Sequence, residues 1–492
     1  MTKLLRVALT ASVAVSLAAQ PIADKYRATA TKLIAMAQQD DDGLDRLEYL
    51  CDRIGNRVSG SESLNKAIDW AVSEMKKAGF ENVQKIPVKV PHWVRGHESA
   101  VLVSPTDRSL HMLGLGDSVG TPPSGVTADV VAVSTFEELA AMAATDKSKV
   151  AGKIVLFNAP YVSYGQTVMY RSAGPSRAAA LGAVGVLVRS ITPLSLRSPH
   201  TGALSYDANI PKIPAAALSI EDAESLARMY KRGVPVRVKL TMEAKMLPDA
   251  DSFDVVGEIR GSEKPEEIVV LGGHIDSWDI GQGAQDDGSG IMATMQAVSL
   301  IKKAGLKPRR TIRLAFWTNE ENGGAGGRAY AKWVGATPAA THVAAIEMDG
   351  GAEKPTGFGF GPVGQGLGGA RRRALPPGAE APPNMAPTAD AAFARVTEIG
   401  TLLEPIHASA IRRGGGGSDI APLMQVGVPG FGMSTVGTHY FDWHHTDADT
   451  ELDPDEAPEM SLSQPLLPEM LAKWLSVDLS VWPASELENL VA

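Results

Sequence analysis

The chain of 492 residues contains a single cysteine, Cys51. One thiol can form neither an internal disulfide nor a metal site built from several thiolates, so a bound metal would depend on histidine and carboxylate ligands. After the N-terminal segment, no stretch reaches the roughly 18 uncharged apolar residues that a membrane-spanning helix needs. The net charge is −9 without an acidic block, which argues against nucleic acid as a partner.

The composition places the chain among large globular proteins. With 44% hydrophobic and 21% charged residues, 492 residues can bury sizeable cores, and the length favours two domains. Residues 1–6 are short and basic, and residues 7–18 are apolar, which is the form of a secretory signal cleaved near Ala18 or Ala19. We therefore expect a signal peptide at residues 1–19, a secreted or periplasmic mature protein and no stable membrane insertion after cleavage. A buried N-terminal helix is the alternative.

Polar side chains follow an apolar run at residues 268–271. The run has the length and branching of a buried strand, and the carboxyl ends of such strands form the ligand crevices of open α/β sheets. Three further apolar runs, at residues 311–317, 343–346 and 428–433, also precede carboxylates or imidazoles. The candidate site residues that follow these four runs are His274, Asp276, Asp286, Glu320, Glu321, Asp349, His444 and His445.

Five of these side chains suit two zinc ions, because Zn²⁺ accepts imidazole nitrogen and carboxylate oxygen ligands. Two cations held close together need negative charge between them, which a bridging carboxylate supplies. We assign Asp286 as the bridge. One ion is assigned to His274 and Asp349, and the other to Glu321 and His445.

Glu320 adjoins a candidate ligand but is surplus to the coordination of the two ions. A metal lowers the pKa of its bound water from about 15.7 to about 7, and a free carboxylate can then take the proton. We interpret Glu320 as the general base. Asp276 follows His274 by two residues, so on an extended chain it can accept the ring N–H that fixes the histidine tautomer. Each pair alone is more often structural, but their joint occurrence at strand ends favours a metal-dependent hydrolase.

Four segments carry a family resemblance: GGHIDSWDIGQGAQDDGSG, NEENGG, EMDGG and HHTDADT. They resemble the co-catalytic zinc exopeptidases, which include carboxypeptidase Q, glutamate carboxypeptidases and bacterial leucine-type aminopeptidases. The resemblance implies the same five zinc ligands and the same base, Glu320. It also implies a cis peptide bond between Asp286 and Asp287. The expected fold is α/β, with a mixed, mostly parallel sheet flanked by helices and an inserted β-rich protease-associated domain.

The expected peptidase domain is discontinuous, at residues 25–97 and 249–480. The insertion at residues 98–248 alternates short β-rich runs with alanine-rich helices, resembles a protease-associated domain, and is expected to wall one side of the substrate cleft. The glycine- and proline-rich stretch at residues 361–387 departs from the family and is expected to be a flexible insertion. The tail after Pro454 also matches the family less well.

Helical spacing of apolar residues predicts two helices, at residues 62–78 and 287–303. The second starts beside Asp286. Glycines at residues 414–417 indicate a close approach of the backbone to the cleft, and Asp419 is a candidate to support the ligands. In many relatives a tyrosine precedes the last histidine ligand and stabilises the tetrahedral intermediate. His444 stands there in this chain and can donate the same hydrogen bond, or it can simply pack against Trp443.

The predicted function is an exported di-zinc exopeptidase that hydrolyses dipeptides or short peptides from a free terminus. An aminopeptidase or dipeptidase is preferred, and Asp279 and Glu347 are candidates to bind the α-amino group. A carboxypeptidase is the alternative. A glutaminyl cyclase-like enzyme would lack the first histidine ligand, and a catalytically silent binding or receptor-like homologue would have lost ligands. The expected partner is a short peptide, and the sequence is compatible with a homodimer.

Overall fold

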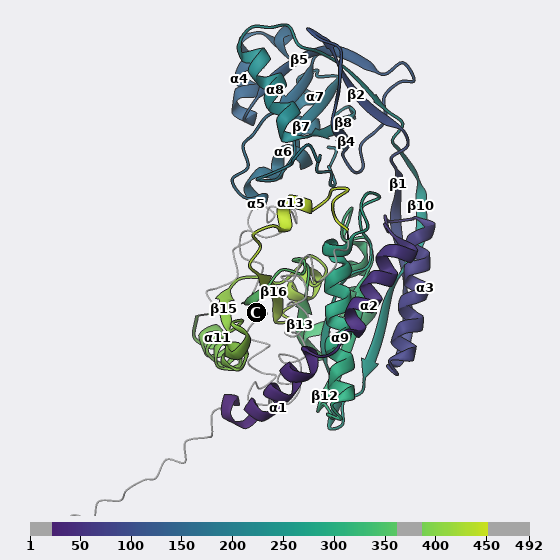
Figure 1. Cartoon of the computed structure of the whole chain (residues 1–492), viewed down its shortest axis with the longest axis vertical. Coiled ribbons are helices and arrows are strands. Elements are labelled where there is room, and N and C mark those ends of the chain that lie inside the picture. Colours follow the sequence, from purple (N-terminus) through teal and green to yellow (C-terminus); the bar gives the residue numbers. More distant parts are fainter. Residues whose placement is uncertain (1–21, 362–385, 451–492) are drawn as a thin grey trace, which may run out of the picture.

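The computed structural model describes residues 22–361 and 386–450. The predicted signal peptide at 1–19, nearly all of the predicted flexible insertion at 361–387 and the tail after Pro454 lie outside the described residues. Two bodies stand one above the other in Figure 1, and each is built on an eight-stranded sheet. Among the described residues, the helices are too short or too polar to cross a membrane.

The first sheet carries all four segments predicted to bear the metal site. Its strand order is β1-β10-β12-β11-β13-β16-β14-β15. The four strands β12, β11, β13 and β16 are mutually parallel, whereas β10 and β14 run antiparallel to them. Strands β14 and β15 also pair parallel, so the expectation of a mixed, mostly parallel sheet is confirmed. The strands are β1 (Glu81–Val94), β10 (Lys245–Ile259), β11 (Lys264–His274), β12 (Arg310–Trp317), β13 (His342–Glu347), β14 (Pro355–Phe360), β15 (Ala410–Arg413) and β16 (Gly430–Thr435).

The central strands are apolar on both faces because helices cover both sides of the sheet. All eight residues of β12 are buried, and so are the last seven of β11. Since parallel neighbours end at the same edge, the segments after β11, β12, β13 and β16 meet there. This edge lies beside the second body, next to the short helix α13 (Tyr440–Trp443) in Figure 1.

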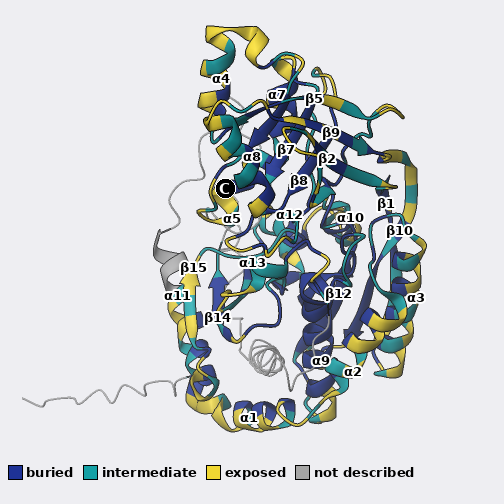
Figure 2. Cartoon of the chain, turned by 45° about the horizontal axis from the view of Figure 1, so that its top comes forward, coloured by how far each residue is buried: buried dark blue, intermediate teal, exposed yellow. Residues whose placement is uncertain are grey.

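Helix α9 (Ser289–Lys303) runs under the site. It begins two residues later than predicted, because Ala284–Gly288 form a separate turn in which Asp286 and Asp287 have non-helical backbone angles. Residues 289–301 are all buried (Figure 2), since α9 packs against the sheet on one side and against α1 (Ile22–Ala37) and α2 (Asp42–Tyr49) on the other. A helix enclosed in this way gives the metal-site loop a rigid support.

Helix α3 (Glu62–Lys77) ends one residue before its predicted end. The side chain of Ser61 caps it by accepting a hydrogen bond from the backbone N–H of Leu64 at 3.0 Å. Its buried face packs against the same core as α9. On the opposite face of the first sheet lie α10 (Ala325–Val334) and α12 (Ala421–Met424), and α11 (Ala386–Gly400) borders β15.

The second sheet uses the residues between Glu98 and Met242. Its order is β3-β2-β9-β5-β6-β7-β8-β4, and separate apolar clusters cover its two faces. Its strands are β2 (Glu98–Ser104), β3 (Arg108–Leu110), β4 (Met112–Gly114), β5 (Val126–Val133), β6 (Ile154–Phe157), β7 (Gly185–Arg189), β8 (Ala215–Leu218) and β9 (Arg237–Met242). Its helices are α4 (Phe136–Thr145), α5 (Tyr164–Thr167), α6 (Met169–Ser172), α7 (Gly174–Ala180) and α8 (Ile220–Lys231).

A two-stranded ribbon joins the two bodies. Strands β1 and β10 pair antiparallel from Glu81 opposite Glu258 to Val94 opposite Lys245, and the ribbon forms the right-hand edge of Figure 1. The chain therefore enters and leaves the second body side by side. Strand β10 already belongs to the first sheet at Lys245, so the boundary predicted between residues 248 and 249 falls inside this strand.

Candidate metal centre

Asp286 lies at the centre of the predicted site. Its Oδ1 atom is 3.2 Å from Nε2 of His274, and its Oδ2 atom is 3.2 Å from Nε2 of His445. One carboxylate thus stands between two imidazoles, one from the first and one from the last of the four sequence segments. This is the arrangement that a bridging ligand requires.

The remaining two predicted ligands fall on opposite sides of Asp286. Oδ1 of Asp349 is 3.8 Å from Nε2 of His274, and Oε2 of Glu321 is 2.9 Å from Nε2 of His445. The ligand atoms of His274, Asp286 and Asp349 lie within 4.8 Å of one another. The structure therefore places Asp349 beside His274 and Glu321 beside His445, as the assignment to two ions requires, and it also brings the ligand atom of His444 within 4.8 Å of those of Asp286 and His445.

The chemistry of these side chains fits zinc. Among the described residues, Oε1 of Glu321 is buried without a hydrogen-bond donor, and Oδ2 of Asp286 has only imidazole nitrogens beside it. Such burial is costly for carboxylates unless a cation is close by. Burial alone would lower the pKa of His274, but the hydrogen bonds and charges of Asp286 and Asp349 outweigh it and raise that pKa well above its usual value. The surplus of negative charge and the oxygen and nitrogen donors match a divalent cation of this type.

The loop that carries Asp286 is held by two other aspartates. The peptide bond between Asp286 and Asp287 is cis, as the family resemblance implied. The Asp287 carboxylate accepts hydrogen bonds from the backbone N–H groups of His274 and Gly290, both at 3.0 Å. Asp449 accepts from the N–H of Gln285 at 2.7 Å and from that of Asp286 at 3.3 Å. Sequence reasoning missed Asp449, although it lies in the HHTDADT segment.

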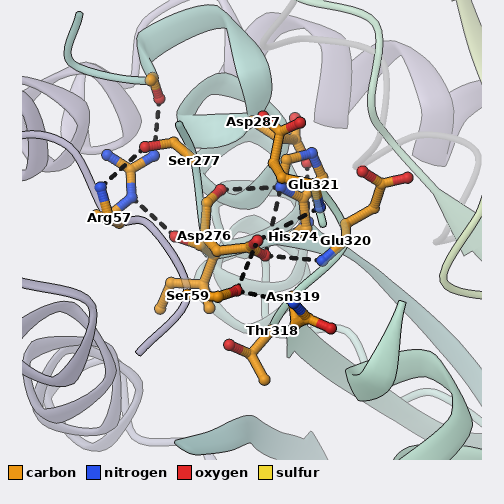
Figure 3. Close-up of polar contacts among 12 residues, drawn as sticks. Arg57, Ser59, His274, Asp276, Ser277, Asp287, Thr318, Asn319, Glu320 and Glu321 are labelled. Carbon is orange, nitrogen blue, oxygen red and sulfur yellow. Dashed lines mark hydrogen bonds and ion pairs between the residues drawn. The ribbon is translucent and has the colours of Figure 1, made fainter. Parts of the chain in front are cut away.

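Asp276 supports the site differently from the prediction. Nδ1 of His274 is 2.9 Å from the main-chain oxygen of Asp276 but 3.8 Å from its carboxylate. The carboxylate instead accepts the backbone N–H of Glu320 at 3.0 Å and that of Glu321 at 3.4 Å, as Figure 3 shows. The alternation of an extended strand no longer applies here because the chain bends at Ile275. Asp276 therefore orients His274 through its carbonyl and positions the Glu320–Glu321 segment through its side chain.

Glu320 lies beside the ligands without joining either set. Burial, together with the carboxylates of Asp349 and Glu321, raises the pKa of Glu320 to about 8. A carboxyl group whose pKa is near neutrality can accept and release a proton in the same reaction cycle. Its backbone N–H donates to the Asp276 carboxylate at 3.0 Å, which fixes the main chain from which the Glu320 side chain extends.

His444 packs directly against the site. Its ring stacks on that of His445 with 3.6 Å between the centroids, and its Nε2 atom is 3.4 Å from Oδ2 of Asp286. Burial and the neighbouring His445 hold the pKa of His444 well below its usual value, so the ring is neutral. Tyr164 and Tyr440 contact its ring, with centroids at 5.0 and 5.1 Å. The arrangement allows either a hydrogen bond to substrate or a bond to the metal.

The two candidates for binding the substrate amino group have structural partners. The carboxylate of Asp279 receives two hydrogen bonds from Arg95, at 2.6 and 2.8 Å. Oε2 of the buried Glu347 accepts the backbone N–H groups of Asp419 and Ile420, at 3.0 and 2.9 Å. A Cβ atom on Gly417 would lie 2.0 Å from the Glu347 carboxylate carbon, which explains why only glycine fits at this position. Both acidic residues therefore act first as structural anchors.

Arg57 was also missed by sequence reasoning. Its buried guanidinium donates to the main-chain oxygens of Ile275, Gln282 and Gly283, at 2.8, 2.7 and 2.8 Å. It thereby ties the end of β11 to the loop before Asp286 (Figure 3). The local sequence does not reveal this role, because the three acceptors are more than 200 residues away.

Comparison with known proteins gives the family. Peptidase family M28 matches residues 254–461, and the PA domain matches residues 126–226. Carboxypeptidase Q from Xenopus laevis is 40% identical over 461 residues, which cover 93% of this chain and 88% of the relative. Carboxypeptidase Q from Homo sapiens is 41% identical over 406 residues, 82% of this chain and 79% of the relative. The chain belongs to peptidase family M28.

Solved structures agree with this assignment. A Peptidase M28 precursor from Shewanella amazonensis has a TM-score of 0.79 and 32% identity, and the match covers 92% of this M28 peptidase and 96% of that chain. A zinc aminopeptidase from Bacillus subtilis shares the fold, with a TM-score of 0.62 and 17% identity over 89% of this chain and 95% of that one. The predicted family of zinc-dependent exopeptidases with an inserted protease-associated domain is confirmed.

Proposed function

We propose that this M28 peptidase is an exported di-zinc exopeptidase that hydrolyses dipeptides or short peptides. The observation that carries the proposal is the position of Asp286 between two imidazoles, each of which has a second carboxylate beside it. Zinc bound there supplies Lewis-acid activation of water and of the scissile carbonyl group. The other steps belong to the side chains of the protein.

Glu320 moves the proton. Its carboxylate accepts a proton from the attacking water and passes it to the nitrogen of the leaving amine, so the group ends the cycle as it began. Burial raises the pKa of Glu320 to about 8, which favours release of the proton to the leaving amine, and the positive charge of bound zinc would favour the ionised form that accepts the proton. His444 is neutral and donates a hydrogen bond toward the carbonyl oxygen, where negative charge develops.

We infer a preference for a free amino terminus, because a carboxylate that is not used to hold zinc can accept a substrate ammonium group. Glu347 lies near the assigned ligand Asp349 and is the candidate for this contact. The inserted domain closes on the site through Tyr164, which contacts the His444 ring, so a short peptide fits better than a long chain.

The test is a peptide panel combined with metal analysis of the purified full chain. We expect about two zinc ions per chain and cleavage of dipeptides with a free amino terminus. N-acetylation should abolish cleavage, whereas C-amidation should be tolerated at least in part. One zinc would favour an acyl transferase, and a chain that binds no zinc would favour a silent homologue. Export is tested separately by following the chain in a secreting host with and without residues 1–19.

A carboxypeptidase is the second candidate. The identity of 40% or more to proteins named carboxypeptidase Q favours it. For a dipeptide the two activities cleave the same bond, so only blocked substrates separate them. Cleavage that survives N-acetylation but requires a free carboxylate would establish this alternative and contradict the preference for the amino terminus.

A further inference from the structure

The inserted domain contacts the candidate metal centre at His444 and His445. The backbone N–H of Thr201 donates to the main-chain oxygen of His445 at 3.0 Å, and Nδ1 of His200 lies 2.7 Å from the main-chain oxygen of His444. His445 has a positive φ of 63°, which non-glycine residues adopt rarely. These contacts from the inserted domain therefore hold a ligand segment whose backbone conformation is not intrinsically favoured.

The side chain of His445 is also held from the inserted domain. Its Nε2 atom faces Glu321 and Asp286, so the ring N–H is left on Nδ1, which lies 3.3 Å from the main-chain oxygen of Thr201. A hydrogen bond from the second ring nitrogen fixes both the tautomer and the ring orientation of a metal-binding histidine. In this chain the acceptor belongs to a different domain from the ligand.

Arg171 fixes that acceptor. It is 6% exposed, and its guanidinium donates to the Thr201 oxygen at 3.0 Å and to the hydroxyl of Tyr164 at 2.7 Å. One terminal nitrogen of Arg171 is 3.4 Å from Nδ1 of His445. Since both of these nitrogens carry hydrogen, they share the Thr201 oxygen as acceptor rather than bonding to each other.

Gly202 leaves the space that this contact needs. Its φ is 128°, and a Cβ atom there would lie 2.2 Å from Arg171 and 2.7 Å from Nδ1 of His445. Any larger residue would displace the guanidinium, the imidazole or both. The local sequence of the inserted domain is thus fitted to the last candidate ligand of the peptidase domain.

We propose that Arg171 and Thr201 of the inserted domain are positioning residues for the metal centre, which orient the His445 imidazole through its Nδ1 side. The inference rests on the proposed role of His445 as a zinc ligand. In addition to forming one wall of the cleft, the inserted domain would then help to hold zinc. Removing the contact of Arg171 and Thr201 with His445 should weaken the binding of one of the two candidate ions. The ion between His274 and Asp349 should be affected less.

The test measures zinc affinity in the full chain by competition with a chelator. Arg171→Met and Gly202→Ala should each displace the Thr201 oxygen from Nδ1 of His445 and so weaken one zinc by about 10- to 100-fold, the loss typical of disturbing the partner of a metal-bound histidine. The other zinc should keep its affinity. With Co²⁺ in place of zinc, the visible absorption spectrum of both variants should change, because it reports the orientation of the ligands.

Two matched controls separate positioning from general destabilisation. Arg189→Met removes another largely buried arginine of the same domain, which pairs with Glu224 rather than with the metal site. Gly233→Ala places a side chain at a positive φ of 75°, where no atom lies within 4 Å of the new Cβ. Both controls should keep the zinc affinity and the Co²⁺ spectrum of the parent chain.

The outcomes are distinct. If Arg171→Met fails to fold, Gly202→Ala decides, with folding checked by circular dichroism. Unchanged zinc affinity in Gly202→Ala, or equal weakening in Gly233→Ala, overturns the inference while leaving the di-zinc proposal intact. A parent chain that binds no zinc overturns the proposed function itself, whatever the variants do.

Discussion

Glu320 and Glu321 are neighbours in the chain with different surroundings. Oε2 of Glu321 is 2.9 Å from Nε2 of His445, whereas Glu320 stands outside both ligand sets. We expect Glu320→Gln to retain zinc while kcat falls by about 10²- to 10⁴-fold, because the amide cannot accept the proton. Glu321→Ala should instead lose zinc. Metal content and steady-state rates check both, and a near-normal rate for Glu320→Gln would falsify the role assigned to the base.

His444 can have one of two roles, a hydrogen-bond donor to the substrate or a metal ligand. It is neutral and 3.4 Å from Oδ2 of Asp286, close enough to the site to act on substrate or on metal. We expect His444→Ala to lower kcat by about 10²-fold while zinc content stays the same, since one hydrogen bond to the developing charge is lost. His444→Asn keeps a donor and should recover part of the rate. Loss of zinc from His444→Ala would mark the residue as a ligand.

Single residues could be assigned from the sequence only where their chemistry and spacing sufficed. The candidate ligands could be proposed from the sequence because each of them follows an apolar run, and such runs are typical of parallel strands that are buried on both faces. The sequence could not predict that Asp276 contacts His274 through its main-chain oxygen, because a bend at one residue decides which oxygen of Asp276 faces the imidazole. The contact of Arg171 with His445 spans 274 positions, and no local pattern encodes it.

At the scale of elements, helix α3 offers a test of local stability. The Ser61 side chain caps its N-terminus by accepting the Leu64 N–H at 3.0 Å. Ser61→Ala should lower the free energy of unfolding by about 1 kcal/mol, the usual value of such a cap, and leave the kinetics unchanged. Ser73→Ala is the matched control in the exposed middle of the same helix, where alanine is slightly favourable. Urea titrations of the two variants measure the difference, and equal stabilities would show that the cap contributes nothing.

Element types were predicted more reliably than element ends. Helix α3 ends only one residue before its predicted end. The agreement is close because its cap and its apolar stripe are local features of the sequence. Helix α9 began later than predicted, because Asp286 and Asp287 use their backbone for the metal-site turn rather than for the helix. The departure falls in the loop that carries the candidate ligand Asp286, where hydrogen bonds with Asp449 and Arg57 override the helical spacing.

At the scale of the whole molecule, one buried histidine at the start of β13 should make the free energy of unfolding depend on pH. His342 begins β13 and lies 2.9 Å from the hydroxyl of Tyr330, and burial and the charge of Arg313 lower its pKa to about 3. The unfolded histidine has a pKa of about 6.5, so it takes up a proton below that pH while the folded one does not. Stability from this group is complete above pH 6.5 and is lost as the pH falls toward 3.

The measurement compares the parent chain with His342→Gln in urea at pH 7 and pH 5. Between these values the parent should lose about 2 kcal/mol more unfolding free energy than the variant, since glutamine does not titrate. Equal losses in both proteins would mean that His342 is already free to ionise in the folded state.

The paired strands β1 and β10 bear on how such a protein arises. Because Val94 lies opposite Lys245, a coding segment for everything between them can be gained or lost in one recombination event without re-routing the host chain. Under the proposed role of Thr201, however, such an excision would also remove the acceptor beside Nδ1 of His445, so the host sheet alone would not reproduce the intact site.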